Sequence, residues 1–304
     1  MSLPDVDVVI PTKDRPDLVS RAVGSVVAQD YPGFIRVIVV ADGAPPELQN
    51  DSRANRRVCV SRNDRSPSAA AARNAGILAA TAPLVAFCDD DDTWTPGKLT
   101  AQVAALRAAE DAIGCGTGFV RVSATSGRSE RIPRSATIDH AQLLRSRVYE
   151  VLMSSLVFDR TRLLEEVGLL DEAIPGSYGE DYDLMLRATR AGPVVAVRQP
   201  LVEKLSHSGS FFAQRWDLII EAIRYLLAKH PDLARDRQGL ARLYGRTALA
   251  QAALGHRSAA RVWATTALRL SASERNSWVA LAMATGLLRP SLVSTLADRR
   301  GRDL

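Results

Sequence analysis

The chain has few of the residues that build disulfide frameworks or soft metal sites. Its 304 residues include three cysteines and four histidines, and Cys59, Cys88 and Cys115 are isolated from one another inside apolar runs. Because these spacings fit neither a zinc site nor a disulfide framework, we interpret the three cysteines as small core residues in a reducing compartment. A disulfide-stabilised scaffold is therefore not expected.

Long apolar runs are missing too. No stretch reaches the roughly 18 uninterrupted apolar residues that a membrane-spanning helix needs. The N-terminal segment, MSLPDVDVVIP, has no basic region followed by a long apolar one. We therefore expect a cytoplasmic location, with peripheral contact at the inner face of a membrane as an alternative.

The glycine-rich motifs that cradle phosphates are absent. The sequence contains neither the GxGxxG pattern of dinucleotide-binding turns nor the GxxxxGK[ST] pattern of triphosphate-binding loops. Dehydrogenases and P-loop enzymes are therefore disfavoured. A nucleotidyltransferase is disfavoured as well, because its first loop would usually be rich in glycine, whereas residues 11–16 here read PTKDRP.

What the first half of the chain does contain is an alternation of short apolar runs with helical patterns. Four strands and two helices are predicted from it: 6–11, 34–42, 57–62 and 83–90 as strands, and 15–29 and 66–81 as helices. Such alternation indicates an α/β fold, with a Rossmann-like, mostly parallel sheet flanked by helices. Ligands of these sheets bind at the carboxyl ends of the strands.

Four consecutive aspartates, Asp89 to Asp92, follow the last of these apolar runs. At a separation of about 5 Å, neighbouring carboxylates repel each other by roughly 1 kcal/mol in a water-like medium, so a cation is expected beside them. We place them before a helix that begins at Thr95 and Pro96. The alternative is that the carboxylates only interact with the N-terminal dipole of that helix, for which one or two would suffice. Four carboxylates without neighbouring His or Cys are better suited to bind a hard divalent ion such as Mg²⁺ or Mn²⁺.

Polar residues also occupy the turns after the first two predicted strands. Thr12, Asp14 and Arg15 follow the first strand, and Asp42 with Gly43 follows the second. Asp42 is suited to accept a hydrogen bond from a nucleobase or a ribose. The alternative is that Asp42 only caps a turn with Gly43.

Four blocks of the first 210 residues, taken together, carry a family resemblance. They read VVIPTKDRPDLVSRAVGSVVAQDYP, VIVVADG, AAARNAGILAATAPLVAFCDDDDTWTPGKL and GSYGEDYDLMLRATRAG. In order and spacing they resemble the family 2 glycosyltransferases of the GT-A fold. The resemblance implies metal-assisted transfer of a sugar, with inversion, from a nucleotide-diphosphate donor, with a UDP-sugar favoured, in the setting of polysaccharide biosynthesis.

The resemblance also implies a role for individual positions around the donor. Asp91 and His207 are the implied ligands of Mn²⁺ or Mg²⁺, and a shift by one residue that brings in Asp90 or Asp92 stays open. The positions implied to contact the nucleotide are Pro11, Thr12, Asp14, Arg15, Asp42, Arg73, Asn74, Asp89 and Asp90.

Glu180 and Asp181 open a later helical pattern. Acidic residues at a helix start are common, because they interact favourably with its dipole. Inverting transfer, however, needs a base for the acceptor hydroxyl, and a carboxylate suits that task. The resemblance implies Asp181 as this base, with Glu180 second, and places Trp94 and Tyr178 beside the acceptor. Packing of Trp94 behind the aspartate turn is the alternative.

The character of the chain changes near residue 215. We predict a catalytic domain at 1–214 and a helical extension at 215–304, in which residues 240–272 resemble one tetratricopeptide-type hairpin. One such unit is too short to be a solenoid. It is therefore expected to pack on the catalytic domain or on a second copy of the protein, giving a homo-oligomer.

This helical extension is basic, with 15 Lys and Arg against 7 Asp and Glu in residues 215–304. Arginines on solvated helix faces explain such a balance better than a nucleic-acid partner, which we do not expect. The sequence leaves a carbohydrate, a lipid-linked or a small-molecule acceptor open. An inactive, transferase-like scaffold that acts through its helical tail is the alternative function, but the presence of both the aspartate run and Asp181 favours an enzyme.

Overall fold

The computed structural model describes residues 3–48, 53–123, 127–148, 150–206 and 215–288. Its strands are β1 (Val6–Thr12), β2 (Ile35–Ala41), β3 (Arg56–Arg62), β4 (Leu84–Phe87), β5 (Asp92–Trp94), β6 (Gly114–Ser123), β7 (Gly127–Arg131), β8 (Thr137–Ile138), β9 (Val157–Asp159) and β10 (Val194–Ser206). The α-helices are α1 (Pro16–Val27), α2 (Ala69–Ala79), α3 (Lys98–Ala108), α4 (His140–Arg145), α5 (Arg160–Arg162), α6 (Glu180–Ala191), α7 (Trp216–Lys229), α8 (Arg237–Ala253), α9 (Arg257–Leu270) and α10 (Arg275–Ala284). Single turns of other helix types are η1 (Met153–Ser155), η2 (Leu163–Val167), η3 (Pro175–Ser177) and η4 (Pro231–Arg235).

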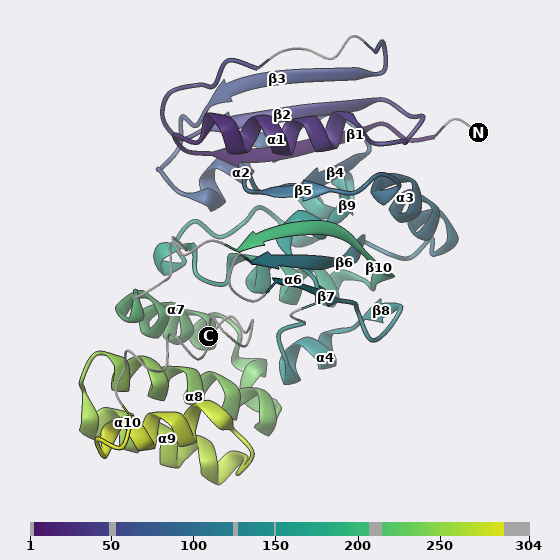
Figure 1. Ribbon diagram of the computed structural model, residues 1–304. Helices are drawn as coiled ribbons and strands as arrows, with labels where there is room; N and C mark the ends of the chain where they lie inside the picture. The colour runs from purple at the N-terminus through teal and green to yellow at the C-terminus, as the bar shows by residue number, and fades with distance from the viewer. Residues whose placement is uncertain (1–2, 49–52, 124–126, 149, 207–214, 289–304) are drawn as a thin grey trace.

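These strands form one sheet in the order β3-β2-β1-β4-β9-β6-β10-β5, with β7 beside β6 and β8 beside β10 (Figure 1). Strands β1 to β4 pair in parallel, as do β6 and β10, whereas β9 and β5 run antiparallel to their neighbours. The predicted α/β class, a mostly parallel sheet flanked by helices, is therefore confirmed. Because β1 lies between β2 and β4, the chain reverses its winding direction there, and ligands bind at such switch points.

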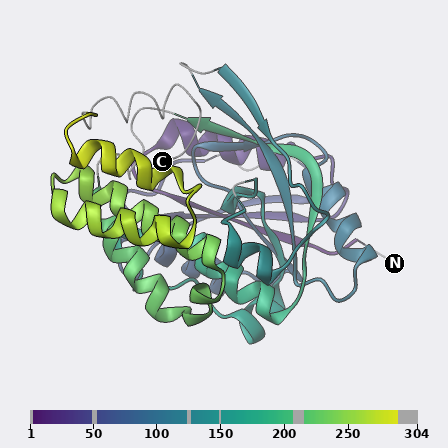
Figure 2. The ribbon, with the colours of Figure 1, turned by 90° about the horizontal axis from the view of Figure 1, so that it is seen from below.

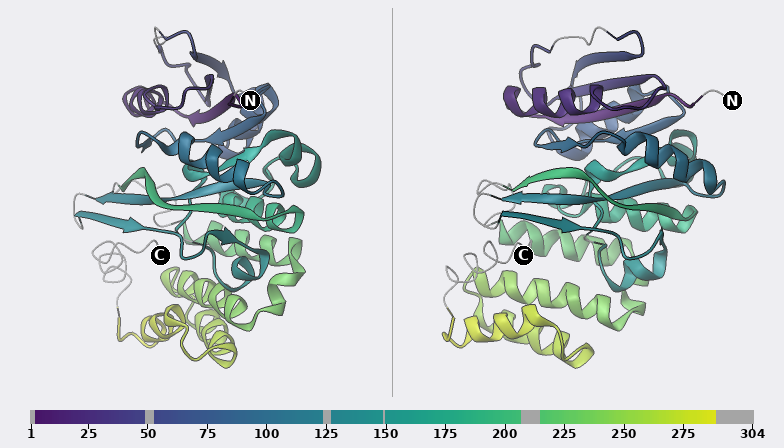
Figure 3. Two further views of the ribbon diagram at one scale, coloured as in Figure 1. Left: turned by 90° about the vertical axis from the view of Figure 1, so that its right-hand side faces the viewer. Right: turned by 45° about the vertical axis from the view of Figure 1, so that its right-hand side comes forward.

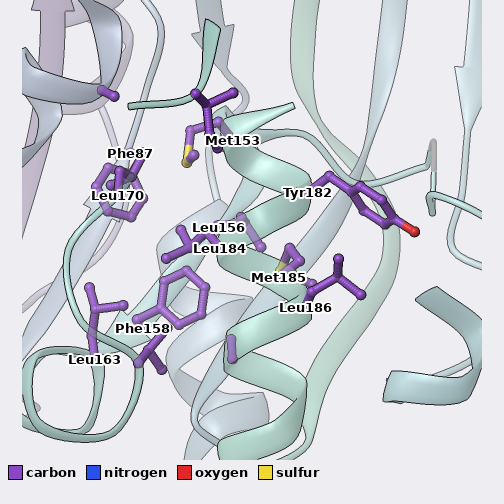
Figure 4. Packing of buried hydrophobic residues seen from close by; sticks show 14 of the residues in the cluster. Phe87, Met153, Leu156, Phe158, Leu163, Leu170, Tyr182, Leu184, Met185 and Leu186 are labelled. Atoms are coloured by element: carbon purple, nitrogen blue, oxygen red, sulfur yellow. The ribbon is translucent and has the colours of Figure 1, made fainter. Parts of the chain in front are cut away.

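The central strands β1 and β4 are buried on both faces of the sheet. Val8 and Ile10 of β1 pack into a cluster that includes residues of α1 and α3, while Val9 packs on the opposite face with residues of α2 and α6. Alternate side chains of a strand point to opposite faces, so a run in which every residue is apolar must be covered on both. Figure 4 shows Leu184 of α6 beside Phe158 in the second of these clusters.

The four predicted strands and two predicted helices are present with shifted ends. The main difference follows β4, where Asp92–Trp94 forms β5 and pairs with β10. The next helix was expected to begin at Thr95 and Pro96, but α3 begins at Lys98. Gly97 has a φ of 84° at the position before it, a left-handed conformation that interrupts the helix and favours glycine.

The C-terminal helices pack directly on the sheet region. Ile219, Ile223 and Leu226 of α7 belong to the same hydrophobic cluster as α6. Helices α8 to α10 enclose a smaller cluster rich in alanine, at the end of the molecule away from β3 (Figures 1 and 3). No helix of the described residues combines the length and the hydropathy that crossing a membrane requires.

The predicted hairpin of two helices is formed by α8 and α9. Its small residues Ala260, Ala264 and Ala267 are fully buried, and Tyr244 contacts Trp263 with ring centroids 5.1 Å apart. Seen from below, α8, α9 and α10 lie together at one side of the sheet (Figure 2). Small residues allow the helix axes to approach closely, which explains the packing.

A buried ionic network fixes α6 to the C-terminal helices. The carboxylate of Asp183, with no exposed surface, lies 2.7 Å from both Lys229 Nζ and His230 Nε2 and accepts a hydrogen bond of 2.8 Å from Arg187. Burial alone would raise the pKa of Asp183, but the hydrogen bonds from His230, Lys229 and Arg187 and the charge of Arg187 lower it well below its ordinary value. Asp183 therefore stays ionised in the core and contributes stability above the ordinary carboxyl pKa, which is lost as the pH falls.

We predict that Asp183→Asn lowers the free energy of unfolding by about 3 kcal/mol at pH 7, because the change removes the buried carboxylate with which Arg187 and Lys229 pair. Urea denaturation followed by circular dichroism measures this difference. Glu166→Gln is the matched control, since Glu166 also pairs with an arginine four residues away, Arg162, but on the surface. Little change is expected for the control, and equal effects of the two variants would contradict a buried network.

Candidate functional site

The aspartate turn lies beside the end of β1, at the switch point of the sheet. Thr12 Oγ1, at the last position of β1, donates a hydrogen bond of 2.8 Å to Asp90 Oδ2. Arg15 Nη1 lies 3.3 Å from Asp90 and 3.5 Å from Asp91. Arg15 is thus one of the cations expected beside the aspartates, and it comes from the turn predicted to contact the nucleotide.

A second cation, Arg73 of α2, connects this turn to the start of α6. Its Nη2 lies 2.5 Å from Asp89 Oδ1, and its Nη1 donates to Glu180 Oε1. Burial lowers the pKa of the Arg73 guanidinium, but the charges of Asp89 and Glu180 more than offset this and raise it above its ordinary value. Arg73, which the resemblance implies as a nucleotide contact, is therefore a second cation beside the aspartates.

Three carboxylates of the turn gather closely enough to share one cation. Asp89, Asp91 and Asp92 each offer a ligand oxygen, and these oxygens lie within 4.8 Å of one another. Burial, followed by the charges of Asp89 and Asp91, raises the pKa of Asp92 well above its ordinary value. Hard oxygen donors under mutual repulsion fit a divalent ion such as Mg²⁺ or Mn²⁺. The second predicted ligand, His207, lies outside the described residues.

Ser154 is hydrogen-bonded to both ends of the aspartate turn. Its hydroxyl accepts a hydrogen bond of 2.9 Å from the backbone nitrogen of Asp89, and its carbonyl accepts one of 2.9 Å from the indole of Trp94. Trp94 is 4% exposed, and the Lys98 ammonium lies 3.8 Å from its ring centre. Trp94 therefore packs behind the aspartate turn and does not offer a ring face to an acceptor. Burial lowers the pKa of Lys98 to about 7.

The turns that follow β1 and β2 lie next to each other. The backbone nitrogen of Asp42 donates to the Thr12 carbonyl at 2.8 Å, and Asp42 Oδ1 accepts a hydrogen bond from Asn63. Gly43 has a φ of 149°, and a Cβ there would come within 2.7 Å of Asp14 Oδ1. Glycine at this position allows the two turns to approach. Pro11 lies buried at the same edge of the sheet.

Asn74 has a different position from the one expected. Its side chain is 1% exposed, and its Nδ2 donates to the Leu170 carbonyl and to Glu172, while its Oδ1 accepts from the Leu170 nitrogen. These bonds use both ends of the amide. Asn74 therefore ties α2 to the segment before α6, and its amide is not directed at a nucleotide.

Glu180 and Asp181 have opposite electrostatic environments although they are adjacent. Glu180 is 7% exposed, and burial raises its pKa to about 7 despite the charge of Arg73. Burial would raise the pKa of Asp181 too, but the charge and hydrogen bond of Arg147 lower it below its ordinary value. Arg147 Nη2 lies 2.7 Å from Oδ1 and 2.5 Å from Oδ2 of Asp181. At neutral pH Asp181 is therefore ionised, while Glu180 is close to half protonated.

A shallow pocket opens beside Asp181. Apolar side chains form most of its wall, and its polar part is made by Arg147 and Asp181; the lining residues are Leu143, Arg147, Val148, Val151, Leu152, Leu156, Asp181, Tyr182 and Met185. Tyr178, predicted beside the acceptor, lies under Arg246 of α8, whose guanidinium carbon is 5.8 Å from the ring centre.

Two of these contacts have no signal in the sequence. Arg147 and Ser154 lie in a segment without a recognisable motif, and 34 residues separate Arg147 from Asp181. Asp92 was considered only as an alternative to its neighbours, yet it is the most buried aspartate of the turn. Only the packing of Arg147 against α6 and of Ser154 against the aspartate turn reveals these roles.

Sequence comparison relates this chain to bacterial glycosyltransferases and polysaccharide proteins. The family model described as glycosyl transferase family 2 matches residues 7–158, half of the chain. The succinoglycan biosynthesis proteins ExoU and ExoO of Rhizobium meliloti are 29% and 31% identical over 62% and 64% of this chain. The aligned region covers 58% of each of them, so the chain spans about three fifths of the length of these relatives.

Solved structures of similar fold cover nearly the whole chain. A crystal structure of S. aureus TarS with UDP-GlcNAc matches with a TM-score of 0.63 at 15% identity, covering 98% of this chain and 92% of that one. The mannosyltransferase PcManGT of Pyrobaculum calidifontis, solved with GDP-Man and Mn²⁺, matches with a TM-score of 0.56 at 17% identity, covering 97% of this chain and 88% of that one. These likenesses confirm the predicted GT-A fold with its C-terminal helices, and the family model matched over half of the chain identifies it as a member of glycosyl transferase family 2.

Proposed function

We propose that this chain is a metal-dependent inverting glycosyltransferase that moves a sugar from a nucleotide-diphosphate donor to an acceptor hydroxyl. The observation that carries the proposal is the bridge made by Arg73, which bonds Asp89 of the aspartate turn and Glu180 at the start of α6. This bridge joins the predicted donor site to Glu180, the neighbour of the predicted base Asp181. A scaffold without activity would not need both carboxylate groups so placed.

The donor would bind at the switch point of the sheet. Its nucleoside would lie over Pro11, Thr12 and Asp14, with Asp42 accepting a hydrogen bond from the base, as the family resemblance implies. Asp89, Asp91 and Asp92 would hold a divalent ion, which, when bound, neutralises the charge that develops on the diphosphate leaving group. UDP is the favoured nucleotide because TarS was solved with UDP-GlcNAc, while the complex of PcManGT makes GDP the alternative.

Asp181 would take the proton from the acceptor hydroxyl. A base must be ionised to accept a proton, and the lowered pKa of Asp181 keeps it so at neutral pH. Glu180 is the second candidate, and its raised pKa suits proton transfer near neutrality. Its bond to Arg73 instead favours a positioning role.

We predict that UDP with Mn²⁺ raises the melting temperature of the wild type by several degrees, and that Asp91→Asn abolishes the part of this rise that needs Mn²⁺. Ligand at 100 times its dissociation constant stabilises a fold by about 2.7 kcal/mol. A thermal-shift screen of UDP, GDP, CDP and dTDP, with and without Mn²⁺, measures it. Asp111→Asn, an exposed position before β6, is the control. An Mn²⁺-dependent rise that survives in Asp91→Asn would contradict the metal assignment.

We predict that Asp181→Asn keeps UDP binding but lowers kcat by about 10²- to 10⁴-fold, because an amide cannot accept the proton. The rate is measured as the hydrolysis of UDP-GlcNAc, in which water replaces the acceptor and UDP is released. The base would activate water as it activates an acceptor hydroxyl. Glu180→Gln is expected to reduce kcat less. If Asp181→Asn turns over normally, the base lies elsewhere.

The pH profile separates the two carboxylates. With Asp181 as the base, its lowered pKa leaves kcat level from about pH 5 upward, because the carboxylate is already ionised there. With Glu180 as the base, kcat would rise through pH 7, where this group loses its proton. The profile is recorded for the wild type and Glu180→Gln. An inflection near pH 7 that disappears in Glu180→Gln would assign the base to Glu180.

A further inference from the structure

Three arginines contact residues at the start of α6 and just before it. Arg147 bonds Asp181, Arg242 Nη2 lies 3.3 Å from the hydroxyl of Tyr182, and Arg246 lies over the ring of Tyr178. Arg242 and Arg246 are one turn apart on α8, so both project from the same face of that helix. Figure 4 shows the Tyr182 ring extending from α6 away from Phe87 and Leu170.

Arg242 and Arg246 form no close ion pair with a carboxylate of the described residues, although the charge of Arg242 acts on Glu274 from a distance. Among the described residues, no carboxylate lies within 4.0 Å of either guanidinium, and the Nε atoms of both are buried without a hydrogen-bond acceptor. The guanidinium carbons lie 5.6 Å and 5.8 Å from the ring centres of Tyr182 and Tyr178. Such stacking orients an arginine while leaving its terminal N–H groups available for an anion.

Arg147 adds a requirement of its own, which rests on the proposed function. While its guanidinium contacts both oxygens of Asp181, that carboxylate is a weaker base toward a hydroxyl, because the contact stabilises its ionised form. An acceptor that draws Arg147 away would therefore strengthen the base, and a partly buried guanidinium leaves one anion readily only for another. The apolar wall of the adjacent pocket offers a surface for the acceptor itself.

We propose that the acceptor carries an anionic group, a phosphate or a carboxylate, and that Arg147, Arg242 and Arg246 bind it. Binding of this group and release of Asp181 are then one event. With a neutral acceptor, Arg147 stays paired with Asp181, and transfer of the sugar is slow. The helical region thereby supplies two of these three arginines through α8.

Binding of simple probes tests this without relying on turnover. Isothermal titration calorimetry is carried out on the full chain saturated with UDP and Mn²⁺, using glucose 6-phosphate, glucuronic acid and glucose. We expect at least one of the two anionic sugars to bind tenfold or more tightly than glucose, and the stronger of them identifies the group. Equal affinities for all three, or an anion that binds only by displacing UDP, would overturn the proposal.

Variants locate the effect. Arg242→Gln and Arg246→Gln are each expected to weaken the anionic probe about tenfold and to leave the affinity for UDP unchanged. Arg257→Gln, which removes the same charge from an exposed position on α9, should leave the probe affinity as it is. Equal losses in Arg246→Gln and Arg257→Gln would mean that only the overall charge matters, and the subsite would be refuted.

Arg147→Gln separates this proposal from the proposed function. If Arg147 restrains the base, the variant releases UDP from UDP-GlcNAc to water several-fold faster than the wild type and binds the anionic probe more weakly. Arg147→Lys keeps the positive charge and serves as the control for folding. Its melting temperature is expected to equal that of the wild type. If Arg147→Gln changes neither the rate of hydrolysis nor the affinity for the probe, the proposed role of Arg147 is refuted. Probe binding that depends on the arginines while Asp181→Asn turns over normally would reject the base but keep the anionic acceptor.

Discussion

The site depends on one buried guanidinium. Arg73 bonds Asp89, which follows β4, and Glu180, which begins α6, although 91 positions of sequence separate these two carboxylates. Without it, two acidic segments would approach each other in a partly buried place, and their repulsion would oppose the packing of α6 on the sheet. The same residue links the aspartate turn to the start of α6, so the packing of α6 and the geometry of the candidate site rest on the same ion pairs.

Adjacent carboxylates acquire different properties from what surrounds them. Glu180 shares Arg73 with Asp89 and is more deeply buried, so its pKa is raised, whereas Arg147 belongs to Asp181 and lowers its pKa. Pairs of titratable groups whose environments separate their pKa values are a common feature of enzyme sites. The two roles therefore come from the partners that packing supplies and not from residue type.

The helical region is part of this arrangement and not an independent appendage. Its helix α7 shares the core cluster of α6, and Lys229 and His230 meet the buried Asp183 on the same helix as the proposed base. Arg242 and Arg246 of α8 reach Tyr182 and Tyr178 on either side of that base. The division into a catalytic domain at 1–214 and a helical extension stays a prediction from the sequence. In the structure, α6 is in contact both with the sheet region and with the C-terminal helices.

The sequence by itself determined the alternation of strands and helices, the place of the aspartate run after a buried strand, and the resemblance that named Asp89, Asp91 and Asp181. These follow from local periodicity and from motifs whose residues are close together in the chain. Tertiary structure alone decided that Trp94 is buried behind the turn, that Asn74 binds Leu170 and Glu172, and that Arg147 pairs with Asp181. Each of these depends on segments that are distant in sequence, and no local pattern specifies which polar group will meet which partner once the helices pack on the sheet.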